Sequence, residues 1–165
     1  MRPSDTLGTN EIFLGPSILM HPLIRHEPSP DHPGWWTWDL PDEERYNATL
    51  GRLLVRGEGD GRARCRMFPD VRQSNLGNIV HGGAILTFID MAMFAGGHMA
   101  GMSDIGAVTL DLSCQFVTPA ELGTPLDCSV ELLRETKRLA FLRGLAEQDG
   151  RTVAAWSGTL RKITR

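Results

Sequence analysis

The seventeen residues from Ser74 to Asp90, SNLGNIVHGGAILTFID, contain the feature of this sequence that decides the fold. A polar loop ends in a His-Gly-Gly triplet, and a strongly apolar segment follows it. From Ile85 to Phe94 the only polar side chains are Thr87 and Asp90. At 3.6 residues per turn this pattern leaves no polar side for water, and so it predicts one long helix packed inside the protein.

Asp90 is the unusual residue of this helix. Its neighbours on the helix surface are Leu86, Met93 and Phe94, and so we expect the carboxylate to be wholly or partly buried. Because burying an ionised carboxylate is costly, such groups are found mostly where they have a function. Asp90 is therefore a candidate catalytic residue. The alternative is a structural acid that caps another element or pairs with a buried arginine.

Gly82 and Gly83 stand where the helix is expected to begin. The first N–H groups of a helix have no partner within it, and the helix dipole is positive there. Without side chains, these residues let a substrate oxygen approach the amides closely. The triplet is thus a candidate oxyanion hole for acyl transfer, although a tight turn leading into a helix explains the same residues.

The spacing of these two features has a geometric consequence. Gly82 and Asp90 are eight residues apart, which is about 12 Å along a helix. A base and an oxyanion donor must both lie close to one reacting carbon. If both groups act together, Asp90 must come from a second, antiparallel copy of the helix. The site would then lie across a two-fold dimer interface and occur twice.

The remainder of the chain from residue 45 has the period-two alternation of strands. Asp149-Gly150 is a strong hairpin signal, and the expected strands are 53–58, 62–68, 106–117, 125–133 and the two halves of 139–160. In 106–117 the apolar side chains share one face: Val108, Leu110, Leu112, Cys114 and Phe116. These patterns predict an α+β fold in which a curved antiparallel sheet wraps around one long central helix.

The first 44 residues differ from the rest, because they hold seven of the ten prolines and three of the four tryptophans. Proline excludes a regular helix or a central strand here. We expect an extended N-terminal arm, 1–44, followed by one folded domain, 45–165. Trp35, Trp36 and Trp38 are expected to dock on that domain or on a second subunit.

Composition excludes several classes of protein. A length of 165 residues fits one domain, and a net charge of -3 has no nucleic-acid signature. Three widely spaced cysteines, Cys65, Cys114 and Cys128, fit neither a disulfide framework nor a zinc site. We interpret them as reduced core residues, which favours the cytoplasm.

A membrane location is not favoured by the sequence. The N-terminus lacks the basic-then-apolar layout of a signal peptide. Residues 84–102 have the length of a transmembrane helix, but Asp90, the Gly96-Gly97 pair and His98 make a buried helix the better interpretation.

The stretch from Ser74 to Asp90 and the strands after it also resemble a known family, the hotdog-fold acyl-CoA thioesterases and their phenylacetic-acid-degradation (PaaI-like) subgroup. The resemblance covers about residues 45–163 and rests on a set of loop and helix residues at their present spacing: Asn75, Gly77, His81, Gly82, Gly83 and Asp90. It implies that the Gly82 amide polarises a thioester carbonyl. It also implies that Asp90 of the other subunit acts as a general base on water, or attacks directly to give a mixed anhydride.

The same resemblance implies supporting roles for four residues. Asn75 would position the carbonyl or the attacking water, and His81 would form a hydrogen bond near the helix start. Gly83 would help to bind the substrate, and the Thr109 hydroxyl would orient water. From the residues alone, Asn75 making an Asx-turn and His81 capping the turn are equally open.

The function expected from the resemblance is hydrolysis of acyl-CoA by a homodimer or a dimer of dimers, without a metal or redox cofactor. Met93, Phe94 and Phe88 are expected to form an apolar pocket wall. The CoA phosphates are expected to meet exposed arginines, with these candidates: Arg62, Arg64, Arg66, Arg138 and Arg143. Two alternatives remain: a hotdog protein that binds acyl-CoA without hydrolysing it, and an enoyl-thioester hydratase or dehydratase.

Overall fold

The computed structural model describes residues 23–103 and 106–163. The first half of the arm lies outside this range. The prediction about a signal peptide concerns these residues and so also falls outside the described part of the chain. The described elements follow in chain order: β1 (Trp36–Thr37), the 3-10 helices η1 (Tyr46–Leu50) and η2 (Val71–Gln73), which flank β2 (Leu53–Gly59) and β3 (Arg62–Met67), then α1 (Gly82–Met99), β4 (Ala107–Phe116), β5 (Leu126–Glu135), β6 (Leu139–Gln148) and β7 (Arg151–Lys162).

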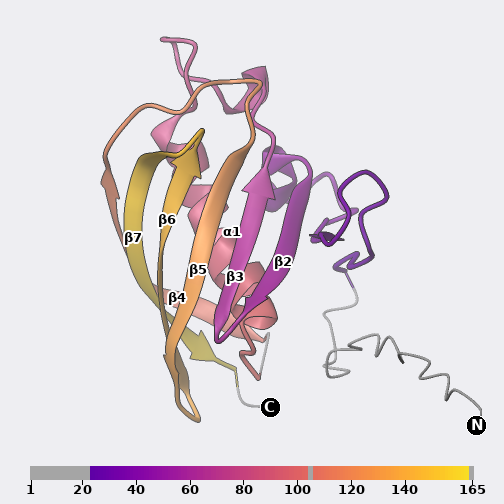
Figure 1. Ribbon diagram of the computed structural model, residues 1–165, viewed down its shortest axis with the longest axis vertical. Coiled ribbons are helices and arrows are strands. Elements are labelled where there is room, and N and C mark those ends of the chain that lie inside the picture. The colour runs from indigo at the N-terminus through magenta and orange to yellow at the C-terminus, as the bar shows by residue number, and fades with distance from the viewer. Residues whose placement is uncertain (1–22, 104–105, 164–165) are drawn as a thin grey trace, which may run out of the picture.

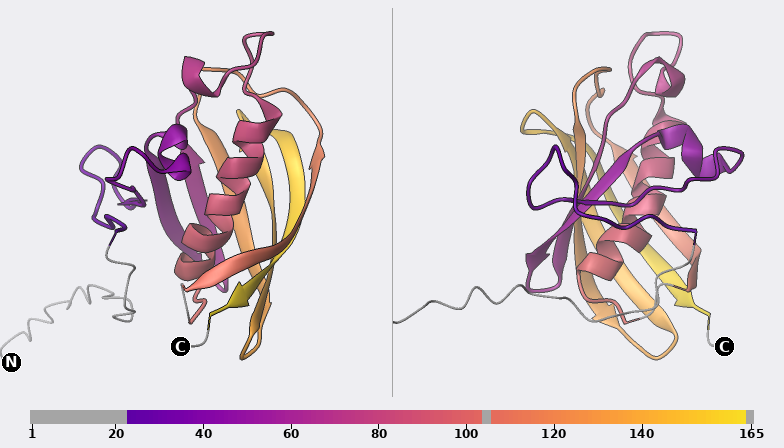
Figure 2. Two further views of the ribbon diagram at one scale, coloured as in Figure 1. Left: turned by 180° about the vertical axis from the view of Figure 1, so that it is seen from behind. Right: turned by 90° about the vertical axis from the view of Figure 1, so that its right-hand side faces the viewer.

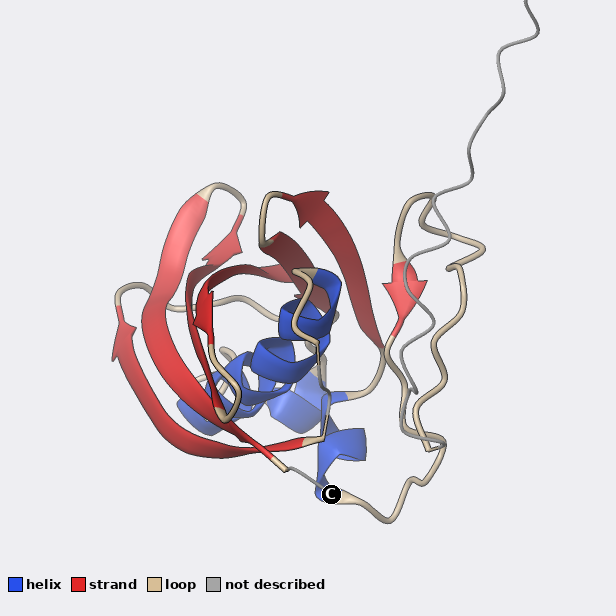
Figure 3. Ribbon diagram, turned by 90° about the horizontal axis from the view of Figure 1, so that it is seen from below, coloured by secondary structure: helices blue, strands red, loops and turns tan. Residues whose placement is uncertain are grey.

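The strands form one antiparallel sheet in the order β1-β2-β3-β5-β6-β7-β4. The sheet curves around α1, which lies on its concave side (Figures 1 and 2). Seen from below, the strands surround the helix on most sides (Figure 3). The predicted α+β hotdog architecture is confirmed.

Two tight turns fix the register of the hairpins. Asp60 and Gly61 join β2 to β3 with φ values of 49° and 72°, and Asp149 and Gly150 join β6 to β7 with values of 50° and 73°. Two consecutive positive φ angles match the right-handed twist of the flanking strands, and Asp-Gly adopts them readily. Both hairpins follow from these local pairs.

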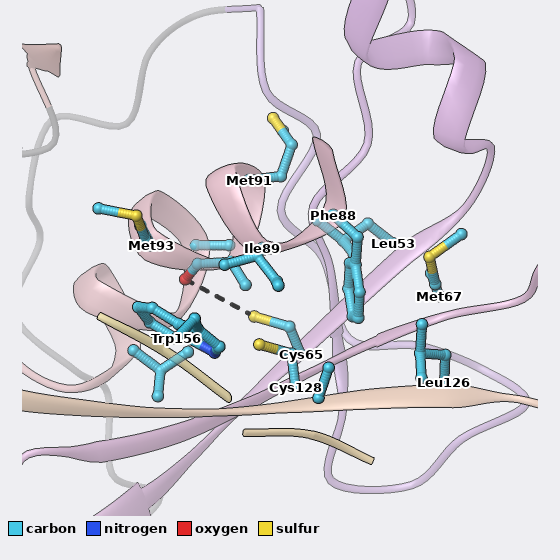
Figure 4. Close-up of a cluster of buried hydrophobic side chains, with 14 of the residues drawn as sticks. Leu53, Cys65, Met67, Phe88, Ile89, Met91, Met93, Leu126, Cys128 and Trp156 are labelled. Atoms are coloured by element: carbon cyan, nitrogen blue, oxygen red, sulfur yellow. Dashed lines mark hydrogen bonds between the residues drawn. The ribbon is translucent and has the colours of Figure 1, made fainter. Parts of the chain in front are cut away.

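The core fills the space between α1 and the sheet. Phe88, Ile89 and Met93 have no exposed surface, and they belong to the cluster of buried side chains between the helix and the strands (Figure 4). Gly96 lets the helix approach β5 closely, because a Cβ at this position would overlap Val130. The prediction that Phe88 and Met93 wall a substrate pocket is therefore wrong, because the helix presses this face directly on the sheet.

The cysteines are free, as predicted, and two of them belong to the same packing. Cys65 and Cys128 are fully buried, and the Cys65 thiol points toward the carbonyl of Ala92 at 4.0 Å (Figure 4). Burial raises the pKa of Cys65 well above its usual value and raises the pKa of Cys128 to about 12. These thiols stay protonated at neutral pH, and so neither is an activated nucleophile.

The described part of the arm folds back as an irregular hairpin and adds β1 to the sheet edge, where Trp36 pairs with Val55. Trp35 is buried between the guanidinium groups of Arg56 and Arg66, at 4.6 and 4.7 Å from the ring centre. Trp38 belongs to the core. Docking of tryptophans on the domain is thus confirmed for these two side chains.

Strand β4 differs from its predicted burial. Leu112 and Cys114 are half-buried against the core, but Val108, Leu110 and Phe116 are 46%, 56% and 53% exposed. The strand lies at the sheet edge and pairs only with β7 within the described chain. A register shift between Thr109 and Asp111 also leaves Leu110 without a partner in β7, so that the alternation of inward and outward side chains is interrupted there.

Within residues 23–103 and 106–163, α1 included, no helix combines the length and hydropathy that a transmembrane span requires.

Candidate active site

The loop that leads into α1 is held at both ends. The Asp70 carboxylate caps η2, and the Gln73 side chain accepts from the Asp70 amide at 2.8 Å. The His81 amide then donates to the Gln73 carbonyl at 2.7 Å, while Val80 donates to Ala120 at 2.9 Å. These contacts fix where α1 begins and how its first amides point.

Asn75 lies in this loop and organises it. Its Oδ1 accepts from the Gly77 amide at 2.8 Å and from the Ile79 amide at 3.4 Å. This is the Asx-turn geometry that the sequence left open. Within the described ranges no acceptor lies opposite its Nδ2 group. The side chain can therefore shape the loop with its oxygen and still offer an N–H to a bound molecule.

His81 is the N-cap of α1. Its Nδ1 accepts from the Gly83 amide at 2.8 Å, which places the ring proton on Nε2. Gly83 is needed for this cap, because a Cβ there would lie 2.9 Å from His81 Nδ1. The Gly83 amide is thus occupied, and any contribution to substrate binding would come from its small size.

The His81 cap does not accept a hydrogen bond from the Gly82 amide. No described residue accepts from it. The ring of Phe116 lies beside this glycine, with Cζ 3.4 Å from the position that a Cβ would take. A free N–H at the positive end of a long helix, next to an open side, can receive a carbonyl oxygen.

Asp90 lies two turns further along α1. It is half-buried, and its Oδ1 accepts from the Thr109 hydroxyl of β4 at 2.6 Å. None of the ion pairs in the described chain includes it. The structural alternative of a partner arginine is therefore not realised among residues 23–103 and 106–163. Thr109 holds the carboxylate in place without neutralising it.

One protomer does not bring the two groups together. Gly82 and Asp90 lie on the same rigid helix, about 12 Å apart along its axis. Both keep some exposed surface, and the sheet leaves one side of α1 uncovered (Figure 2, left). A cavity of about 650 Å³ lies between the arm, η1 and Met91, but neither Gly82 nor Asp90 lines it.

Three of the five candidate arginines are already engaged. Arg66 forms two hydrogen bonds with Asp127, Arg64 contacts Glu58 and Glu147, and Arg143 contacts Glu131. Along β3 the arginines alternate with Ala63, Cys65 and Met67, which are buried toward α1. Arg64 and Arg66 therefore lie on the sheet face that points away from the helix.

Sequence reasoning missed two contacts of the site. Phe116 appeared only as one apolar residue of a strand, and its position against Gly82 depends on the sheet order. The Tyr46 hydroxyl of η1 lies 3.0 Å from the Thr87 hydroxyl, although 41 residues separate the two. Among the described residues no group of three or more metal-ligating side chains could hold an ion.

Comparisons with known proteins agree with this architecture. A model of the thioesterase superfamily matches residues 77–155, which include the helix and its acid. Over this stretch, just under half of its length, the chain is similar to the thioesterase superfamily. Human acyl-coenzyme A thioesterase 13 is 26% identical over 102 residues, 58% of this chain and 68% of the human protein.

Several solved structures have the same fold as this chain. A mutant of phenylacetic acid degradation protein PaaI from Thermus thermophilus has a TM-score of 0.60 at 22% identity, over 72% of this chain and 98% of that one. A hypothetical thioesterase from Streptococcus pneumoniae, determined with coenzyme A, has a TM-score of 0.58 at 18% identity, over 68% and 89%.

Proposed function

We propose that this protein is an acyl-CoA thioesterase whose active site is shared between two copies of the chain. The observation that carries the proposal is that α1 holds both a Gly82 amide without an acceptor and an Asp90 carboxylate without a cationic partner in the described chain. The Gly82 amide supplies the oxyanion donor that thioester hydrolysis needs, and the Asp90 carboxylate supplies the base or nucleophile. Their separation on one helix requires the second copy.

Strand β4 supports a second copy as the missing partner. It is an edge strand with an unpaired side in the described chain, and it exposes Val108, Leu110 and Phe116. Exposed apolar edges of this kind are sites where strands of other chains pair. A two-fold axis beside β4 would place the helix start of one copy near Asp90 of the other.

The reaction follows from these two groups. The carbonyl oxygen would accept from the Gly82 amide, which stabilises the negative charge of the tetrahedral intermediate. In one route Asp90 of the second copy removes a proton from water, the water oxygen bonds to the carbonyl carbon, and the C–S bond breaks. The proton then passes to the CoA thiolate. In the other route an Asp90 carboxylate oxygen bonds to the carbonyl carbon, the C–S bond breaks and CoA leaves as the thiolate. Water then hydrolyses the mixed anhydride, which releases the carboxylic acid, restores Asp90 and supplies the proton that the thiolate takes up.

Three further observations support the remaining parts of the proposal. The S. pneumoniae relative was determined with coenzyme A, which supports a CoA thioester as the substrate. Free, buried Cys65 and Cys128 are typical of a reducing compartment, and we place the protein in the cytoplasm. The chemistry requires only amide, carboxylate and water, so that no metal or redox cofactor enters it.

The test is thiol release from acetyl-, hexanoyl-, palmitoyl- and benzoyl-CoA by the wild-type chain and by Asp90→Asn. We expect the wild type to release CoA from at least one substrate. Because Asp90 is the proton acceptor or nucleophile, the variant should lose at least about 100-fold in turnover. Unchanged circular dichroism and thermal unfolding would show that Asp90→Asn is folded.

Two results would contradict the proposal. One is binding of acyl-CoA, measured by calorimetry, without thiol release, which would indicate a binding protein. The other is near-normal turnover in Asp90→Asn. Hydration of crotonyl-CoA, followed by the loss of its ultraviolet absorbance, would instead indicate a hydratase.

A further inference from the structure

Phe116 is a large apolar side chain that lies directly against Gly82, the candidate oxyanion donor. It ends β4, and its ring edge points at Gly82, with Cζ, Cε1 and Cε2 at 3.4, 3.6 and 3.8 Å from the position of a Cβ. The side chain is 53% exposed. The ring therefore lies beside Gly82, on the side toward which a Cβ would project.

This position constrains what binds at the amide. A thioester carbonyl that accepts from Gly82 has two substituents, the acyl chain and the CoA sulfur. Both are bonded to the carbonyl carbon, and so they begin in the space beside the amide, which the Phe116 ring walls on one side. Leu86, one turn further along α1, is 36% exposed on the same stripe as Gly82 and adds apolar surface.

We propose that Phe116 is a specificity-determining residue that contacts the acyl chain close to the carbonyl and favours apolar acyl groups of several carbons over acetyl. The inference rests on the thioesterase function proposed above. A rigid ring can remove several methylenes from water at little entropic cost, whereas an acetyl group offers only one methyl to the same surface. The predicted pocket residues Phe88 and Met93 cannot have this role because they have no exposed surface.

The experiment compares kcat and KM for acetyl-CoA and hexanoyl-CoA in the wild type, Phe116→Ala, Phe116→Leu and Val117→Ala. Val117 is the matched control: it is the next residue, it is 57% exposed, and it is not among the atoms nearest to Gly82. We expect Phe116→Ala to lower the hexanoyl-to-acetyl ratio of kcat/KM about tenfold. Phe116→Leu, which keeps a large apolar side chain at this position, and Val117→Ala should retain most of the wild-type ratio.

The outcomes separate this inference from the proposed function. An unchanged ratio in Phe116→Ala, with an active wild type and an inactive Asp90→Asn, would overturn the inference alone. An equal loss on both substrates, together with a smaller assembly by light scattering, would also overturn it, because Phe116 would then act only in subunit contact. A wild-type chain that hydrolyses no thioester would overturn both.

Discussion

At the residue scale, the site consists of paired contacts between α1 and β4. Thr109 donates to Asp90 at 2.6 Å, and Phe116 lies against Gly82. The hydroxyl occupies one carboxylate oxygen and leaves the other without a hydrogen-bond donor in the described chain. A half-buried acid with this environment stays available for chemistry at its other oxygen.

Replacing Thr109 tests how much this hydrogen bond contributes. A hydrogen bond to a charged group is worth about 1.5–3 kcal/mol, and so we expect Thr109→Val to reduce turnover about tenfold or more by releasing the Asp90 side chain. Thr109→Ser keeps the hydroxyl and should stay near wild type. Steady-state thiol-release kinetics of the two variants give the comparison, and equal rates would show that Thr109 does not position Asp90.

At the scale of elements, the arm and the end of α1 meet through two histidines. His26 Nδ1 donates to the Thr37 carbonyl at 2.9 Å, and its ring contacts those of Trp36 and Trp38. The His98 ring is 6.0 Å from that of His26, and its Nδ1 is buried without a partner in the described chain. The arm is therefore docked through rings that pack best when both histidines are uncharged.

This contact makes the stability of the protein depend on pH. Burial lowers the pKa of His26, partly offset by the bond to Thr37, and burial together with His26 lowers the pKa of His98. The unfolded chain therefore takes up protons at a higher pH than the native state does. The stabilisation is present above the usual value of about 6.5 and is lost as the pH falls below it.

Denaturant titrations between about pH 8 and pH 5 measure this effect. The free energy of unfolding of the wild type should fall more steeply below pH 6.5 than that of the double variant His26→Gln/His98→Gln, which cannot take up these protons. Parallel curves for wild type and double variant would show that the pair does not titrate on folding.

At the scale of the whole molecule, the proposed active site is divided between two copies of the chain. The sheet leaves one side of α1 uncovered, and on the helix Gly82, Leu86 and Asp90 recur every four residues as a stripe that keeps exposed surface. An eight-residue separation on a rigid helix cannot close by any motion of side chains. We therefore expect activity to depend on assembly, with both sites of a dimer needing both chains.

Mixing two inactive variants tests this dependence. Asp90→Asn removes the base, and Gly82→Val places a side chain in front of the amide. A mixed dimer would contain one intact site and one doubly altered site, and so random exchange of the two variants should restore about a quarter of wild-type activity. If both variants are folded and the mixture stays inactive after subunit exchange, Gly82 and Asp90 do not act across an interface.

The sequence by itself determined the local elements of this protein. The apolar stretch after His81 specified α1, the alternation of polar and apolar residues specified the strands, and Asp149-Gly150 specified a hairpin, because each depends on neighbours within a few residues. The stretch from Asn75 to Asp90 also marked the loop and helix that carry the candidate site. These features need no knowledge of how the elements pack.

Only the tertiary structure decided which side chains surround the site. Thr109 reaches Asp90 and Phe116 reaches Gly82 because the sheet places β4 at its edge beside α1, and Trp38 is buried because the arm folds back onto the core. Three apolar side chains of β4 are exposed for the same reason. Strand order and sheet curvature arise from contacts between distant segments, and a periodic pattern records only which face is apolar, not what covers it.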